Sequence, residues 1–127
     1  MDIREMIASD RFAAFSGIKL VSCGGGEAVA EVELTEHHLN AVGTAQGGLI
    51  FTLADTAFAA VCNDGRPATV ALNNDISFLR PAMAGGTLRA TATLVSSGKA
   101  TCCVDVRVTD GAGKLVAKMQ CIGHTRG

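Results

Sequence analysis

One segment constrains the fold more than any other: the apolar run from Leu49 to Cys62, which contains a single ionisable residue, Asp55. Alanine and leucine are frequent in this run, and both are strong helix formers. The run is apolar nearly all round, which is typical of a helix buried on every side. Extended to Gln46–Asn63, the helix would be about 27 Å long, and the residues Asp64–Pro67 would end it. The polar residues inside the run argue against a membrane span.

Alternating apolar and polar residues predict strands before and after this helix, and glycine-rich segments between them predict turns. Residues 3–15 show the spacing of a short amphipathic helix that ends at Gly17. A helix that is apolar all round needs cover, which an antiparallel sheet curved around it can supply. The sequence therefore predicts one α+β domain, residues 1–127, with a long central helix wrapped by a curved antiparallel six-stranded sheet. The expected strands cover residues 18–22, 27–34, 68–78, 87–94, 102–109 and 115–122.

Length and composition fit one packed domain and argue against several classes of protein. The chain has 127 residues, of which 48% are hydrophobic and 18% charged, so it can build a core. Its net charge of -1 lacks the basic excess of a nucleic-acid binder. The five cysteines include no CxxC pair, so zinc-site spacing is absent. We expect all of them to be reduced packing residues of a cytoplasmic protein, and the N-terminus shows no signal-peptide pattern.

Asp55 is the chemical anomaly of the apolar run. Burying a carboxylate is costly unless the group is paired or functional. One interpretation is a structural carboxylate that accepts a hydrogen bond from a nearby threonine or backbone N–H. The other is a general base or nucleophile in a partly dry cleft, where burial tunes its pKa. The sequence favours the second interpretation.

Gly47 and Gly48 open the predicted helix, where N–H groups have no intrahelical partner and carry the positive end of the helix dipole. Glycine lets a ligand approach this backbone closely, and an oxygen that develops negative charge would be stabilised there. A plain, tightly packed turn is the alternative. Gly47 and Asp55 are about 12 Å apart along one helix, so they cannot both touch one carbonyl group. The spacing therefore predicts a site at a dimer interface.

The centre of the chain resembles the signature of the phenylacetic-acid-degradation (PaaI-like) thioesterases, a family of the hotdog superfamily. The matching residues are His38–Gly48, Phe51, Leu53–Ala59 and Cys62–Asn63, and Phe78–Pro81 followed by Gly85–Leu88 matches the family's strand and turn. The similarity covers residues 12–124. It implies the hotdog fold and hydrolysis of acyl-CoA thioesters, with CoA as part of the substrate and neither a separate cofactor nor a metal. It also implies a homo-oligomer, a tetramer built from two dimers, with no membrane partner.

By this resemblance, Asp55 activates the water or attacks the thioester carbonyl, and the Gly47 N–H of the other subunit polarises the carbonyl oxygen. Asn40 stands where the family places an asparagine that orients the nucleophile or the substrate. Thr56 follows the acid, where its hydroxyl could hold the water or bond a backbone carbonyl of its own helix. The family usually has His-Gly-Gly, but here Gln46 precedes the two glycines. Gln46 can donate a hydrogen bond to the carbonyl but cannot act as acid or base, so proton transfer would depend on Asp55.

The acyl-CoA itself suggests further contacts. CoA carries several phosphates, and Arg80, Lys99 and Lys114 each lie near an expected turn where they could bind them. Each of the three could equally be a solvated surface charge. The family suggests an aryl or medium-chain acyl group. The candidates for the floor of the acyl pocket are Phe12, Phe15, Phe58 and Met83.

Two other functions stay open at this point. A hotdog hydratase or dehydratase acting on enoyl thioesters would be expected to use a close Asp/His or Glu/His pair, and Gln46 in place of a histidine weakens that interpretation. A non-catalytic acyl-CoA-binding module would keep the fold and the pocket without needing Asp55. No DNA-binding segment is evident, which argues against a transcriptional regulator.

Overall fold

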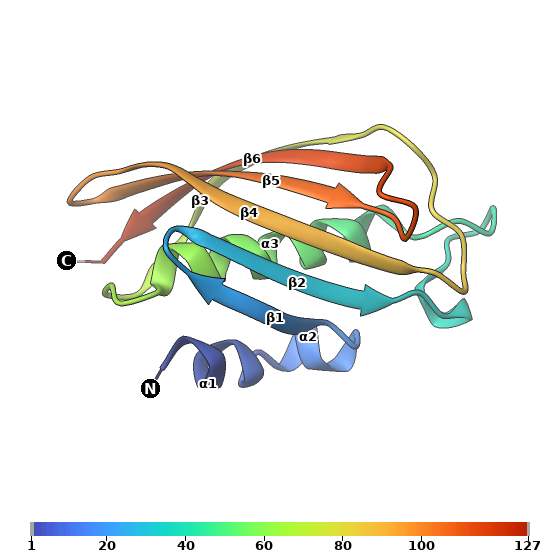
Figure 1. The fold of residues 1–127 in the computed structure, drawn as a ribbon, viewed down its shortest axis with the longest axis horizontal. Coiled ribbons are helices and arrows are strands. Elements are labelled where there is room, and N and C mark those ends of the chain that lie inside the picture. The colour runs from blue at the N-terminus through green and yellow to red at the C-terminus, as the bar shows by residue number, and fades with distance from the viewer. Residues whose placement is uncertain (1, 127) are drawn as a thin grey trace.

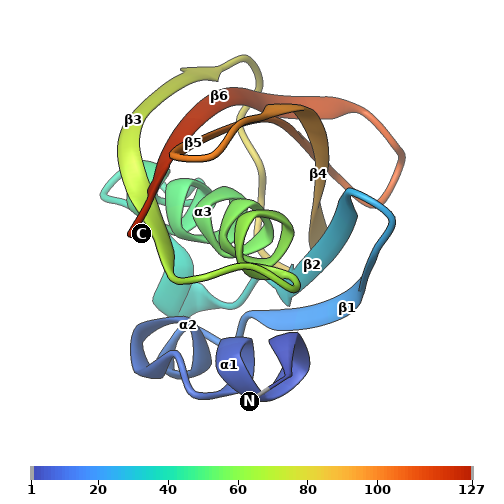
Figure 2. The ribbon, with the colours of Figure 1, turned by 90° about the vertical axis from the view of Figure 1, so that its left-hand side faces the viewer.

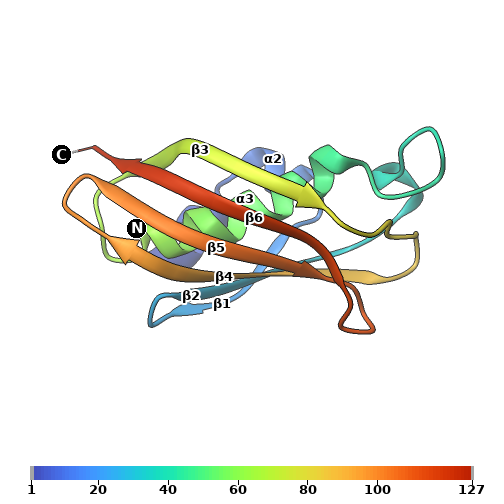
Figure 3. The same cartoon turned by 90° about the horizontal axis from the view of Figure 1, so that it is seen from above.

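One long helix, α3, lies in the curve of a six-stranded antiparallel sheet (Figures 1 and 2). The computed structural model describes residues 2–126, and it confirms the fold that the sequence predicts. The strand order is β1-β2-β4-β5-β6-β3, so β1 and β3 form the two edges, and Figure 3 shows β3 beside β6 at one of them. The elements are α1 (Ile3–Ala8), α2 (Arg11–Phe15), β1 (Lys19–Gly24), β2 (Glu27–Glu33), the 3-10 helix η1 (Glu36–His38), α3 (Gly47–Asn63), β3 (Thr69–Phe78), β4 (Thr87–Ser97), β5 (Thr101–Thr109) and β6 (Leu115–Thr125).

The alternation in the sequence decides which face of the sheet covers α3. Val104, Val106 and Val108 of β5 are completely buried, whereas the residues between them are exposed, as expected for side chains that alternate across a strand. Ala90 and Ala92 of β4 are equally buried. Their small side chains let the helix lie close to the sheet.

The helix α3 is not buried on every side, which corrects the expectation from its composition. Its core-facing residues are buried, but Gly48 is exposed and Phe51, Thr52, Asp55 and Ala59 are partly exposed. These positions recur every three or four residues, so they form one stripe along the helix. We call them the open stripe of α3. Within residues 2–126, no helix has the length and apolar character needed to cross a membrane.

The N-terminal segment forms two short helices rather than the single helix expected over residues 3–15. The first helix stops at Ala8, and Ser9 is its C-cap. Asp10 then starts α2, because its side chain accepts a hydrogen bond of 3.0 Å from the Ala13 backbone N–H. A side chain that caps a helix start competes with continuation of the preceding helix.

A disulfide joins Cys62, near the end of α3, to Cys102 of β5. Both residues are buried in the core. Cys23, Cys103 and Cys121 are free. The expectation of five reduced cysteines is therefore wrong for this pair, and the cysteines no longer argue for a cytoplasmic location. The two partners are 40 residues apart, so only the packing of α3 on β5 brings them together.

The edge strand β3 carries an unusual amount of exposed apolar surface. Val70, Leu72 and Phe78 of this strand, and Leu79 after it, are each more than half exposed. The strand pairs with β6 on one side only. Proteins usually cover or interrupt a long apolar edge because it can pair with another chain. This edge and the open stripe of α3 both leave apolar side chains uncovered.

Candidate active site

Asp55 lies in the middle of α3 on the open stripe. Its Oδ1 accepts a hydrogen bond of 3.1 Å from Nδ2 of Asn74 in β3. Burial raises the pKa of the Asp55 carboxyl above its ordinary value, the Asn74 hydrogen bond opposes that rise, and the negative charge of Asp10 adds to it. A half-buried carboxylate with a raised pKa and one fixed oxygen has the properties of a general base. Its partner is an amide from another element, not the nearby threonine or backbone N–H of the structural interpretation.

Asn74 is absent from the site residues expected from the sequence. The available signal is a pair of amides, Asn73 and Asn74, inside a predicted strand, where asparagine is uncommon. Opposite Asn74 on β6 lies Cys121. Burial raises the pKa of the Cys121 thiol to about 12, and the nearby Asp55 charge adds to this effect. The thiol is therefore protonated at neutral pH and cannot serve as a nucleophile.

The N-terminus of α3 presents one unpaired N–H group. Gln46 is the N-cap, and its side-chain Oε1 accepts a hydrogen bond from the Gly48 N–H. The Leu49 N–H bonds the Gln46 carbonyl. Within residues 2–126, the Gly47 N–H donates no hydrogen bond. Gly47 therefore has the free donor that an oxyanion needs, while the Gln46 side-chain oxygen is already occupied as a helix cap.

Asn40 builds the loop in front of this helix. Its Oδ1 accepts hydrogen bonds from the backbone N–H groups of Val42 and Thr44, at 3.0 and 3.1 Å. Its Nδ2 donates to the Thr44 hydroxyl at 2.9 Å. The loop borders a cavity of about 330 Å³ that brings three expected site residues together, Asn40, Gly47 and Arg80. Asp55 does not line this cavity.

Thr56 faces away from the candidate site. It is buried, with 3% of its surface exposed. Its hydroxyl donates a hydrogen bond of 2.8 Å to the Thr52 carbonyl. Of the two interpretations of Thr56, the geometry is that of a helix threonine bonded to a backbone carbonyl one turn earlier.

The three expected CoA-binding cations do not share one region within the chain. The Arg80 N–H bonds the Val116 carbonyl at 3.2 Å, so Arg80 lies beside the β5–β6 turn that contains Lys114. Lys99 lies in the β4–β5 turn, and Figure 1 shows these two turns at opposite ends of the sheet. Within residues 2–126, no three His, Cys, Asp or Glu side chains are grouped so that they could hold a metal ion.

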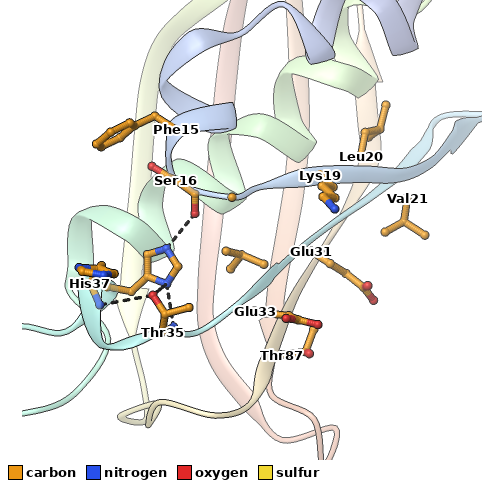
Figure 4. A pocket seen from close by; sticks show the side chains of 13 residues that line it. Phe15, Ser16, Lys19, Leu20, Val21, Glu31, Glu33, Thr35, His37 and Thr87 are labelled. Carbon is orange, nitrogen blue, oxygen red and sulfur yellow. Dashed lines mark hydrogen bonds between the residues drawn. The ribbon is translucent and has the colours of Figure 1, made fainter.

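A larger groove of about 1050 Å³ lies elsewhere, between α2, η1 and the adjacent ends of β1 and β2 (Figure 4). His38 closes one side of it. Its Nδ1 accepts a hydrogen bond from the Thr35 N–H at 3.0 Å, and its Nε2 lies 2.8 Å from the Ser16 carbonyl. These partners assign the proton to Nε2. His38 is thus occupied in holding η1 against the end of α2, and neither Asp55 nor Gly47 lines this groove.

The expected pocket-floor residues divide into two groups. Phe58 is 2% exposed and packs in the core against Gly123, so it is not the floor of an open pocket in this chain. Phe12, Phe15 and Met83 are exposed by 65%, 89% and 61% of their surfaces. These three are available to contact a ligand or another chain.

The fold and these groups define the class of protein. One long helix wrapped by six antiparallel strands is a hotdog fold, and here its helix carries a carboxylate and begins with a free N–H. The chain belongs to the thioesterase superfamily, whose family model matches residues 42–117.

Comparison with individual proteins gives the same family. The chain is 39% identical over 122 residues to the acyl-coenzyme A thioesterase PaaI of Escherichia coli strain K12, covering 96% of this chain and 87% of that one. The structure of E. coli PaaI superposes with a TM-score of 0.93 over 97% of this chain and 89% of PaaI. Human acyl-coenzyme A thioesterase 13 is 33% identical over 91% of this chain and 86% of its own length. The structure of smu.793 from Streptococcus mutans UA159, bound to acetyl CoA, has 32% identity and a TM-score of 0.84, covering 89% and 91% of the two chains.

Proposed function

We propose that this protein hydrolyses acyl-CoA thioesters to a free acid and CoA, with Asp55 and the Gly47 N–H as the reacting and stabilising groups. The observation that carries the proposal is the pair itself: a half-buried carboxylate with a raised pKa and an unpaired N–H at the start of the same helix. The proposal agrees with the acyl-CoA thioesterase names of the E. coli and human relatives. It requires no metal and no separate cofactor.

In this proposal the active form of the protein is a dimer. Gly47 and Asp55 are about 12 Å apart along α3, too far for both to act on one carbonyl. Two copies of α3 packed antiparallel about a two-fold axis near Phe51 and Thr52 would bring Gly47 of one copy opposite Asp55 of the other. Packed helices lie about 8–10 Å apart, which leaves room for a thioester between them. Two identical sites result, one on each side of the axis.

Two uncovered surfaces support this arrangement. The open stripe of α3 contains the residues that would face the axis, and the β3 edge offers free backbone groups and exposed apolar side chains. Antiparallel pairing of two β3 edges would extend the sheet and place the two α3 helices side by side. A tetramer made from two such dimers belongs to the same proposal.

The reaction would proceed by addition and elimination. Asp55 takes a proton from water, the water oxygen bonds to the thioester carbon, and the Gly47 N–H of the second subunit stabilises the oxygen that becomes negative. When the carbonyl reforms, the carbon–sulfur bond breaks and CoA leaves as a thiolate, which takes up a proton. Direct attack by the Asp55 carboxylate, through a mixed anhydride that water then hydrolyses, is the second route. In both routes Gln46 caps the helix and transfers no proton.

The CoA moiety would lie at the end of the sheet that contains Arg80 and Lys114. Arg80 lines the same cavity as Gly47. The proposed two-fold axis reverses the ends of the partner's sheet, so Lys99 of the partner subunit would come to the end that carries Arg80. An aryl or medium-chain acyl group would extend toward apolar side chains at the interface. A cytoplasmic location, where acyl-CoA is formed and consumed, completes the proposal.

A panel of short, medium, long and aromatic acyl-CoAs tests the activity through release of the CoA thiol. We expect the Asp55→Asn variant to lose about 10²- to 10⁴-fold in turnover, the usual contribution of a general base. Asp105→Asn is the matched control, because Asp105 is exposed on the outer face of β5. Binding of CoA without thiol release would point to a binding module, and water addition to an enoyl-CoA would point to a hydratase. Full turnover by Asp55→Asn would remove this residue from the mechanism.

A further inference from the structure

We propose that Asn74 is a positioning residue for Asp55: its amide fixes one carboxylate oxygen, favours the ionised base and leaves the second oxygen to take the proton. This inference rests on the proposed function and adds a residue to its site. It starts from two observations on one side chain, the hydrogen bond to Asp55 and a buried amide oxygen without a partner.

A β-bulge directs Asn74 toward the helix. The pairing of β3 with β6 shifts its register between Ala71 and Asn73, which is the mark of an extra residue in β3. Before the bulge, Thr69 is buried; after it, Asn74 lies opposite the buried Cys121. In a regular strand Thr69 and Asn74 would face opposite sides, because they are five positions apart and side chains alternate at each position. The bulge brings both to the inner face and leaves Asn73 exposed.

Of the two polar atoms of the Asn74 amide, one has a hydrogen-bond partner. Its Nδ2 donates to Asp55 at 3.1 Å, whereas its Oδ1 is buried and accepts no hydrogen bond within residues 2–126. A buried unpaired carbonyl destabilises a fold, and an apolar side chain of similar shape avoids that penalty. Packing and stability therefore do not explain an asparagine at this position. What the amide provides is an N–H donor beside the carboxylate.

That donor acts on the charge of Asp55. An ionised carboxylate oxygen only accepts hydrogen bonds, so an N–H donor stabilises the ionised form. The other influences favour the neutral form: burial, and the negative charge of Asp10 at the start of α2. Cys121, across on β6, is uncharged in the acidic range, as any thiol is. Among these neighbours, Asn74 is the one that favours the ionised base.

The pH dependence of kcat/KM tests this role. We expect Asn74→Leu to move the acid limb of the profile to higher pH. At a pH on that limb, kcat/KM should fall by about tenfold or more, the size of one hydrogen bond to a charged group. The unfolding temperature should change little, because the variant loses the hydrogen bond to Asp55 but also the unpaired buried carbonyl. Gln120→Leu, the same kind of change at an exposed position of β6, should leave the profile in place.

Two further variants test the direction in which the acid limb moves and provide for a folding defect in Asn74→Leu. Asp10→Asn retains a capping side chain but removes a negative charge, so it should move the acid limb to lower pH. Asn74→Asp keeps the shape of the side chain and replaces the donor by a second carboxylate, so it should move the limb upward even if Asn74→Leu does not fold.

Titration of the Asp55 carboxyl carbon by NMR separates this inference from the proposed function. If the wild-type protein hydrolyses no acyl-CoA, the proposed function fails, but the titration still compares Asp55 with and without Asn74. We expect its midpoint to move upward in Asn74→Leu and in Asn74→Asp. Unchanged midpoints and unchanged acid limbs in both variants would overturn the role of Asn74.

Discussion

Gly47→Pro removes one N–H from the site and almost nothing else. Gly47 is the first residue of α3 after its N-cap, Gln46, and proline is well tolerated at this position because its N–H has no intrahelical partner. The backbone also fits: Gln46 is extended, with φ -63° and ψ 133°, which suits a residue before proline. Gly47 is not among the glycines with positive φ. The substitution should therefore preserve the helix and delete its free donor.

The expected loss is about 10²- to 10³-fold in kcat, the contribution of one oxyanion-binding N–H. The neighbouring N–H cannot replace it, because the Gly48 N–H is bonded to the Gln46 side chain. The matched control is Gly47→Ala. It keeps the N–H but adds a Cβ 3.3 Å from Cζ of Phe78, so it reproduces the crowding by the proline ring. Because Phe78 is half exposed, its ring can shift, and Gly47→Ala should remain active. Equal kcat values for the two variants would refute an oxyanion role for the Gly47 N–H.

Mixing Gly47→Pro with Asp55→Asn extends the same prediction to the subunit arrangement. Each variant alone should be nearly inactive. After subunit exchange, half of the dimers are mixed, and each mixed dimer has one site with both groups intact, so roughly one quarter of the wild-type activity should return. Light scattering during chromatography would check that the species is a dimer or a tetramer. Activity no higher than the sum of the two parents would show that the two groups do not meet across an interface.

The remaining predictions concern stability. Gly123→Ala should lower the free energy of unfolding by about 1–3 kcal/mol through overpacking, because its Cβ would lie 2.8 Å from Cγ2 of Thr69. Chemical unfolding measures the change. Gly111→Ala is the control, because no atom lies within 4 Å of its added Cβ. Reduction of the Cys62–Cys102 disulfide should lower the free energy of unfolding by about 4 kcal/mol, given its sequence separation of 40 residues. Urea unfolding with and without a reductant measures the effect, and equal midpoints would contradict it.

Local patterns in the sequence predict most of the fold because they act over a few residues. Period-two alternation identifies the strands, and the apolar run from Leu49 to Cys62 identifies α3. The composition of α3 does not predict its open stripe, because Phe51 and Ala59 are apolar residues that fit buried positions as well. Apolar spacing alone does not predict the break between α1 and α2 either, which depends on Asp10 as an N-cap residue.

The site was less predictable because its contacts join distant segments. Asp55 stands out as the one acid in an apolar run, and Gly47 as a residue at a helix start. The Asn74 contact depends on a bulge that changes which side of β3 faces the helix; the Asn73–Asn74 pair is unusual in a strand but does not fix the position of the bulge. The capping bond of Gln46 was also not predicted: its side-chain oxygen accepts from the Gly48 N–H, while donation by its amide nitrogen to a substrate stays a prediction.

Within residues 2–126, several groups on α3 and β3 are not fully paired or buried. The Gly47 N–H donates to no group within residues 2–126, Asp55 is a half-buried charge, and Asn74 has an unpaired buried oxygen. The open stripe of α3 and the edge of β3 expose apolar surface beside them. All of these features lie on α3 or β3, which is the face that the proposed dimer would cover. Docking of a second copy on this face would cover the apolar surface and, by the same movement, bring each carboxylate opposite a free N–H. Assembly and catalysis would then depend on one interface, so substitutions that weaken the dimer should lower activity even where they touch neither Gly47 nor Asp55.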